Sequence, residues 1–274
     1  MSTTFLFIGA GRMAESMIKG LQSSKDHNIS IIAGNQGNTE RLQQLFSLYA
    51  VETTTDWIHH VRESSVIVLA VPPDAHDAVL EKLSTAIDGQ LVISVAAGVG
   101  LKKLEDNLPA RTPVAWVMPN TASEAGESMS IYTHAETLDA NQEQQLKILL
   151  DSIGSSEKCT EEQIHKLTAV TGSAPAFLYE FASALINAAS SYGISEGQAR
   201  KLVSQMIYGS AVMLKSGLSP IDLREAVTTP GGATAAGLEI LKEADFGQLI
   251  QKAVQATNER AAELGKAVTD IKTV

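Results

Sequence analysis

Two stretches near opposite ends of the chain carry residue types suited to holding small anions. The first, GAGRMA at residues 9–14, directly follows a short apolar run at 3–8. A strand, a tight turn and a helix in that order make the G-x-G-x-x-A form of the dinucleotide fingerprint. Gly9 allows the turn, Gly11 lets the backbone approach a pyrophosphate, and Ala14 keeps the helix close to the strand. This stretch therefore predicts dinucleotide binding.

The second stretch, VTTPGGATAAGL at residues 227–238, combines hydroxyl residues with a Pro-Gly-Gly turn and the start of a helix. Proline fixes φ, and glycines let backbone N–H groups come close to a ligand. The N–H groups and partial positive dipole of a helix start suit a carboxylate. Thr229 and Thr234 add hydroxyls that donate or accept hydrogen bonds. An ordinary helix–turn–helix joint has the same local pattern, so the residues alone leave both readings open.

Alternating strands and helices must position the first stretch. After the run at 3–8, strands are expected at 29–33, 51–53, 65–71, 91–95 and 114–117. Helices are expected after the fingerprint and at about 39–48, 57–61 and 75–83, with a last one at about 141–152. Several strands are nearly unbroken apolar runs, as in parallel sheets buried on both faces. Their carboxyl ends carry Pro or small residues, which suggests a cofactor groove. The fold class is therefore α/β, with an N-terminal Rossmann-type doubly wound sheet.

The end of the second strand bears on the choice of cofactor. NAD enzymes place Asp or Glu there to hold the ribose 2′-hydroxyl, whereas this chain has Asn35 and Gln36. Without a carboxylate, nothing repels a 2′-phosphate, which favours NADPH and leaves NADH possible. No Arg stands at the strand end to clamp that phosphate.

From Thr160 onward only helices are expected. Thr160 and Ser195 each begin a capping box, and Ser219-Pro220 is typical of a helix start. Pro175 lies inside a long apolar segment, where a kink is expected. We expect a dinucleotide-binding domain over 1–155 and a helical domain over 156–274, joined at 153–160. Many small residues and a thin core predict that the helical domain forms a homodimer or a higher homo-oligomer.

Composition excludes several function classes. The net charge is −10, with no long basic run, which argues against nucleic-acid and anionic-membrane partners. The single cysteine, Cys159, rules out an intramolecular disulfide. No apolar stretch approaches the roughly 20 residues needed to span a bilayer, and no signal-type run opens the sequence. The six histidines show no ligand-like spacing, so no metal site is expected. A cytoplasmic location is expected.

Taken together, these motifs resemble pyrroline-5-carboxylate reductase, the enzyme that makes proline. The resemblance is collinear over nearly the whole chain, and residues 227–238 are close to the family signature. Further matching pieces are TAVTGSAPAF at 168–177, SVAAG at 94–98 and MPNT at 118–121. The resemblance implies a Rossmann domain followed by an all-α dimerisation domain. It also implies a substrate bound where the helices of a second subunit meet the nicotinamide.

The resemblance implies a role for several residues. Thr234 matches the family threonine whose hydroxyl bonds the ring nitrogen of the substrate. Glu161 matches an acidic residue that lies close to the substrate. The positions that would hold the substrate carboxylate are Thr229, Gly231, Gly232 and Ala233. The positions that match cofactor contacts are Gly9, Ala10, Gly11, Arg12, Met13, Ala14, Asn35, Ala70, Val71, Pro72, Ala96 and Ala97.

The chain departs from the family pattern mainly on the cofactor side. Pro72 stands where the family usually has Lys, and Trp116 and Gln36 each replace a usual Arg. Two alternatives therefore stay open. One is a reductase of the same architecture for another small substrate, such as a β-hydroxy acid, for which Lys166 is the only nearby proton donor. The other is a catalytically weak paralogue that binds a dinucleotide and acts as a regulatory protein.

Overall fold

A computed structural model describes residues 2–24 and 28–270. The chain forms two compact units. The residues up to Gly172, together with those from Asn258 on, form the first, which we call the sheet unit. Residues Ser173–Thr257 form the second, which we call the helical unit. Each unit is described by itself.

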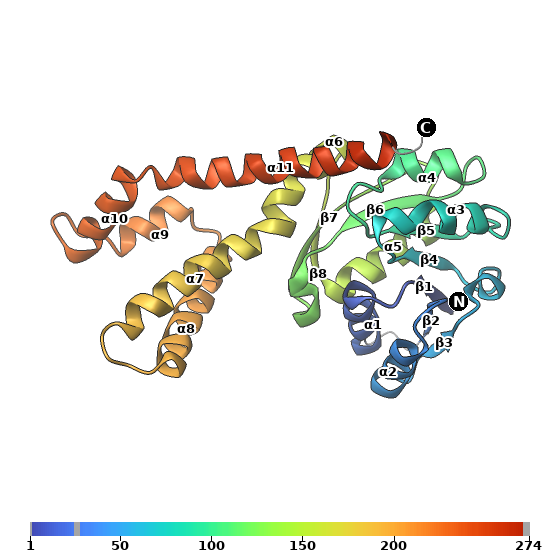
Figure 1. Ribbon diagram of the computed structural model, residues 1–274, viewed down its shortest axis with the longest axis horizontal. Helices are drawn as coiled ribbons and strands as arrows, with labels where there is room; N and C mark the ends of the chain where they lie inside the picture. The colour runs from blue at the N-terminus through green and yellow to red at the C-terminus, as the bar shows by residue number, and fades with distance from the viewer. Residues whose placement is uncertain (1, 25–27, 271–274) are drawn as a thin grey trace. The chain divides into compact units, whose positions relative to one another are not determined.

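The sheet unit is built on one eight-stranded sheet with the order β3-β2-β1-β4-β5-β6-β7-β8 (Figure 1). Strands β1 to β6 are parallel, β7 is antiparallel to β6, and β8 is parallel to β7. The order 3-2-1-4-5-6 is that of the doubly wound dinucleotide-binding fold, which confirms the predicted fold class. The strands are β1 (Thr3–Ile8), β2 (Ile29–Gly34), β3 (Glu52–Thr54), β4 (Val66–Leu69), β5 (Leu91–Ser94), β6 (Val114–Met118), β7 (Ser128–His134) and β8 (Gly154–Lys158).

Alternating side chains of the strands fill two cores, one on each face of the sheet. In β1, Phe5 and Phe7 pack on one face, while Leu6 and Ile8 pack on the other. The first core is covered by α1 (Arg12–Ser23), α2 (Thr39–Tyr49) and α5 (Ala140–Ile153). The second is covered by α3 (His76–Ser84), α4 (Leu101–Asn107) and the 3-10 turn at Trp57–His60. Both faces are buried, which explains why the strands are apolar without interruption.

The far edge of the sheet differs from the expectation. Strands β7 and β8 and helix α4 were not predicted, and the stretch expected to join the domains forms β8. Ser155, Glu157 and Lys158 in β8 are exposed, so the strand lacks the apolar run that marks a buried one. Helix α6 (Glu161–Thr168) packs against β7, which places it within the sheet unit. A domain boundary at 155/156 stays a prediction.

The helical unit contains helices only, as its sequence predicts. The Ser195 capping box and the Ser219 cap are formed in this unit, and the Thr160 capping box is formed at the start of α6 in the sheet unit. A π-helical turn at Ala169–Ser173 separates α6 from α7, so Pro175 falls in the first turn of α7. A proline in a first turn removes no hydrogen bond that the helix needs. The remaining helices are α7 (Ala174–Ser190), α8 (Glu196–Leu214), α9 (Pro220–Ala226), α10 (Ala233–Glu243) and α11 (Phe246–Asp270).

Large apolar side chains of the helical unit are exposed in the single chain. None of the residues of α7, α9 or α10 is buried. By length and composition alone, the helical stretch at residues 161–190 is long and apolar enough to cross a membrane, whereas no such stretch was expected from the sequence. Exposed apolar side chains in such numbers mark an interaction surface. Its members include Leu178, Phe181, Leu202, Met206, Met213 and Ile240.

Candidate active site

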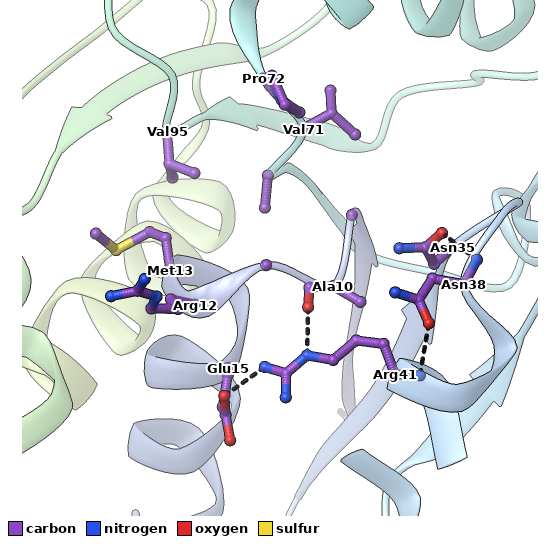
Figure 2. A pocket seen from close by; sticks show the side chains of 13 residues that line it. Ala10, Arg12, Met13, Glu15, Asn35, Asn38, Arg41, Val71, Pro72 and Val95 are labelled. Carbon is purple, nitrogen blue, oxygen red and sulfur yellow. Dashed lines mark hydrogen bonds and ion pairs between the residues drawn. The ribbon is translucent and has the colours of Figure 1, made fainter. Parts of the chain in front are cut away.

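A cavity of about 680 Å³ lies at the carboxyl ends of the central strands (Figure 2). It sits where β1 separates β2 from β4, the point at which the strand order reverses. Ligands of open α/β sheets bind in this place. Most of the predicted cofactor positions line the cavity, namely Gly9, Ala10, Gly11, Arg12, Met13, Asn35, Ala70, Val71 and Pro72.

The fingerprint turn is shaped by Gly9. Its φ of 112° is a conformation that side-chain-bearing residues rarely adopt. A Cβ at this position would lie 2.5 Å from the carbonyl oxygen of Ala70. Gly11 is the N-cap of α1, and a Cβ there would meet no atom within 4 Å. No side chain caps the helix by accepting a hydrogen bond from its first N–H groups. The turn therefore presents free backbone donors to an anion.

Three predicted cofactor positions do not line this cavity. Ala14, in the first turn of α1, is fully buried in the first core, in accord with its expected packing role. Ala96 is buried and Ala97 is exposed, both just after β5. Val95, from the same strand end, lines the cavity instead.

A buried histidine holds the Pro72 turn. The Nδ1 atom of His76 lies 3.0 Å from the carbonyl oxygen of Pro72, and since a carbonyl only accepts, Nδ1 carries the proton. The other ring nitrogen, Nε2, is buried without a hydrogen-bond partner among the described residues. Burial lowers the pKa of His76, so the ring is neutral.

The end of β2 is organised by its amides. The Asn35 side-chain oxygen accepts hydrogen bonds from the backbone N–H groups of Gly37 and Asn38, at 3.0 and 3.1 Å. Asn38 in turn caps α2 by accepting from the N–H of Arg41 at 2.9 Å. The N-cap of α2 is therefore Asn38, the residue before Thr39. Asparagine is the stronger cap because its carbonyl oxygen reaches the next turn readily.

Sequence reasoning missed a charged group in the cavity wall. Arg41 donates from Nε to the carbonyl oxygen of Ala10 at 2.8 Å and forms an ion pair with Glu15 (Figure 2). The hydroxyl of Tyr49 donates to Glu15 at 2.9 Å. The Arg41 guanidinium holds the pKa of Glu15 below its usual value, and burial together with Glu15 raises the pKa of Tyr49. The sequence position of Arg41 did suggest that it lies near the cavity, because the first turn of a helix that follows a strand lies beside that strand's carboxyl end. Its contacts with Ala10 and Glu15 could not be read from the sequence.

Trp116 is integrated into the core beside the cavity. It is almost fully buried, and its ring N–H donates to the carbonyl oxygen of Ala96 at 2.9 Å. Its ring also lies 4.9 Å from the ring of His165 on α6. The departure from the family Arg therefore has a local structural role, because the indole anchors the turn after β5.

Glu161 lines a second, smaller cavity of about 420 Å³ within the sheet unit. A Cβ at Gly100 would lie 1.9 Å from the Glu161 carboxylate, so a larger residue there would require the Glu161 side chain to shift. Glu161 makes no hydrogen bond or ion pair with any residue that the structure describes. His165 lines the same cavity.

Residues 227–238 form the start of α10 in the helical unit. Gly231 has a φ of 72°, and the N–H of Gly232, the helix cap, donates to the carbonyl oxygen of Thr229 at 2.9 Å. No side chain caps the helix, so its first N–H groups are available to an anion. Thr234 is the second residue of α10 and is exposed.

The predicted site residues therefore fall in three places. The cofactor positions surround the larger cavity, and Glu161 belongs to the smaller one, both in the sheet unit. The residues Thr229, Gly231, Gly232, Ala233 and Thr234 belong to the helical unit. The hydroxyl and the N–H groups at the start of α10 are suited to a carboxylate beside a hydrogen-bonding partner.

Comparisons with known proteins cover both units. Residues 161–264 match the family model described as pyrroline-5-carboxylate reductase dimerisation, and residues 4–98 match one described as NADP oxidoreductase coenzyme F420-dependent.

Whole proteins match over nearly their full length. A pyrroline-5-carboxylate reductase from Corynebacterium melassecola is 34% identical, over 96% of this chain and 99% of its own length. The solved pyrroline-5-carboxylate reductase from Coxiella burnetii is 30% identical, with a TM-score of 0.89 over 96% of this chain and 99% of that one. A Plasmodium falciparum pyrroline carboxylate reductase with NADP bound is 26% identical, with a TM-score of 0.85 over 96% and 98%. The chain belongs to the pyrroline-5-carboxylate reductase family.

Proposed function

We propose that the protein reduces 1-pyrroline-5-carboxylate to L-proline by transferring a hydride from NADPH to the cyclic imine carbon. The observation that carries this proposal is the formed dinucleotide cavity at the switch point of the sheet, in a chain that matches the family over almost its whole length. The protein is an oxidoreductase of proline biosynthesis in this proposal.

The substrate is a five-membered cyclic imine that bears a carboxylate. Bound NADPH supplies the hydride, and protonation of the imine nitrogen makes the neighbouring carbon more electrophilic. The reaction thus needs orientation and one hydrogen-bond partner for the nitrogen, with no metal centre or His–Asp dyad. The hydroxyl of Thr234 takes that place in the proposal. The first N–H groups of α10, with Thr229, bind the carboxylate.

NADPH is the proposed cofactor. The matched N-terminal family model is described as an NADP oxidoreductase, and the Plasmodium relative was solved with NADP bound. The end of β2 carries Asn35 in place of the carboxylate that would repel a 2′-phosphate.

A homodimer is the proposed assembly, and the helical unit is its interface. The dimerisation model covers the helices whose apolar side chains are exposed in the single chain. Nothing in the composition favours a nucleic-acid partner, and a cytoplasmic location is part of the proposal.

Neither alternative is favoured. A β-hydroxy acid reductase would need Lys166 for proton transfer, and its ammonium forms an exposed ion pair with Glu162 at 2.6 Å. A regulatory paralogue was suggested by the departures at Pro72 and Trp116. Pro72 nevertheless lines a formed cavity, and Trp116 anchors the turn after β5.

A direct assay tests the proposal. The purified protein is mixed with pyrroline-5-carboxylate and NADPH or NADH, and the absorbance of the reduced cofactor is followed. We expect Thr234→Ala to lower turnover at least about tenfold, or about 1.4 kcal/mol of transition-state stabilisation. Thr234→Ser keeps the hydroxyl and should retain most of the activity. Absence of oxidation with both cofactors, despite cofactor binding, would refute the enzyme reading.

A further inference from the structure

The cavity that receives the cofactor has a fixed guanidinium in its wall. Arg41 reaches from the first turn of α2 to the fingerprint turn, where its Nε donates to the carbonyl oxygen of Ala10. Its side chain is 22% exposed and lines the cavity, so a bound ligand can contact the guanidinium. We propose that Arg41 gives this cavity its preference for a dinucleotide that carries a 2′-phosphate.

The position of Arg41 is the first argument. In this fold the adenine ribose lies at the carboxyl end of β2, where a nearby Arg accommodates a 2′-phosphate. Asn35, at that strand end, and Asn38, which follows it, line the cavity together with Arg41. The Asn38 cap also fixes the backbone N–H of Arg41. The loop that follows β2 and the guanidinium are thus one ordered wall (Figure 2).

The free hydrogen-bonding capacity of Arg41 is the second argument. A guanidinium has five N–H donors in a planar fork. Among the described residues, one points to Ala10, one to Glu15 and one, from Nη1 at 3.3 Å, to Gln44. The remaining donors are available to a phosphate, and guanidinium–phosphate bonds are strong because both partners are charged.

The third argument concerns the ordering of the side chain. Glu15 partly offsets the charge of Arg41, yet it also holds the fork in one orientation and is itself held by Tyr49. An arginine that is already ordered loses less conformational freedom when a phosphate binds. Lys82 on α3 is a second cation near the loop that follows β2, with its ammonium 3.5 Å from the side-chain oxygen of Gln36, although it does not line the cavity.

Gln36 stands where the resemblance places a usual Arg, so the loop itself lacks that cation. Arg41, in the first turn of α2, supplies a guanidinium in its place. The inference rests on the proposed function only in taking a nicotinamide dinucleotide as the ligand of the cavity.

Calorimetric titration with NADP⁺ and NAD⁺ tests it without turnover, because the two differ only in the 2′-phosphate. We expect the wild-type protein to bind NADP⁺ more tightly, and Arg41→Gln to raise the Kd for NADP⁺ at least about tenfold. The Kd for NAD⁺ should stay within about threefold, since that ligand lacks the contacted group. The matched control is Arg62→Gln, which removes an exposed guanidinium just before the amino end of β4. The cavity lies at the other, carboxyl end of the strands. It should leave both affinities unchanged.

Three results would overturn the inference. They are a wild-type protein with no preference for NADP⁺, an Arg41→Gln protein that keeps the wild-type ratio of the two affinities, and an equal loss for both cofactors. Arg41→Lys covers the case in which Arg41→Gln does not fold. It keeps the charge without the fork, so we expect the ratio to fall several-fold, and an unchanged ratio would overturn the guanidinium's role.

The titration also separates this inference from the proposed reaction. If the affinity pattern holds while pyrroline-5-carboxylate is not reduced, the reaction is wrong and the role of Arg41 stands. If the substrate is reduced equally well with both cofactors and the affinities do not differ, the role of Arg41 is wrong and the reaction stands.

Discussion

Replacing Trp116 with Phe should destabilise the sheet unit by a predictable amount. The change removes the ring N–H that donates to the buried carbonyl oxygen of Ala96. That oxygen also accepts from the backbone N–H of Val99 at 3.3 Å, so the change removes one of its two hydrogen bonds, which is worth about 0.5–1.5 kcal/mol. The smaller ring also leaves a void in a core position, which costs about 1–2 kcal/mol more. The free energy of unfolding should therefore fall by about 1.5–3.5 kcal/mol.

The chain offers a matched control, because it contains one other tryptophan. Trp57 is also buried in the sheet unit, and its ring nitrogen makes no hydrogen bond to any described residue. Trp57→Phe removes the same atoms and should lose only the void contribution, about 1–2 kcal/mol. The difference between the two variants isolates the hydrogen bond to Ala96.

Urea unfolding followed by far-ultraviolet circular dichroism measures both variants, since each substitution alters the protein's fluorescence. Linear extrapolation of the unfolding free energy to zero urea gives the stability loss of each variant under the same condition. Equal losses for Trp116→Phe and Trp57→Phe would refute the assigned role of the indole N–H. Retention of the full NADP⁺ affinity in Trp116→Phe would show that the turn after β5 does not need this anchor to bind cofactor.

Two further predictions follow from the cavity wall. Gly9→Ala places a Cβ against the Ala70 carbonyl at a φ of 112°, so it should lower the free energy of unfolding by about 2–5 kcal/mol and weaken nucleotide binding. The control is Gly11→Ala, whose Cβ meets no atom within 4 Å, and it should lower the free energy of unfolding by less than about 1 kcal/mol. Since burial lowers the pKa of His76 below its ordinary 6.5, the unfolded chain binds more protons and stability falls as pH drops below that value. This fall in urea-unfolding free energy should shrink in His76→Gln and persist in the exposed His59→Gln; equal pH profiles would contradict it.

The sequence predicted the central sheet well because its signal is local. Strands such as β4 are buried on both faces and are therefore short apolar runs between turn residues. Strand β8, with the sequence GSSEK, has no such run and becomes a strand only through pairing with β7. The missed elements are thus those that tertiary contacts create.

The cofactor cavity was predictable to a similar extent. The residues at 9–14 and at 70–72 combine turn chemistry with strand ends, and both signals lie within a few residues. Arg41 was missed because its partners, Ala10 and Glu15, are about thirty positions away along the chain. Such a contact depends on how two helices flank β1 and β2, which spacing alone does not encode.

The two outer strands of the sheet limit how the protein can associate with itself. An open sheet could in principle grow by pairing its edge with that of another molecule, as in fibrils. Strand β3 is three residues long, and β8 carries exposed Glu157 and Lys158. Short and charged edges disfavour such growth. Self-association is thereby left to the apolar helices, whose proposed homodimer would be a closed assembly rather than an extending one.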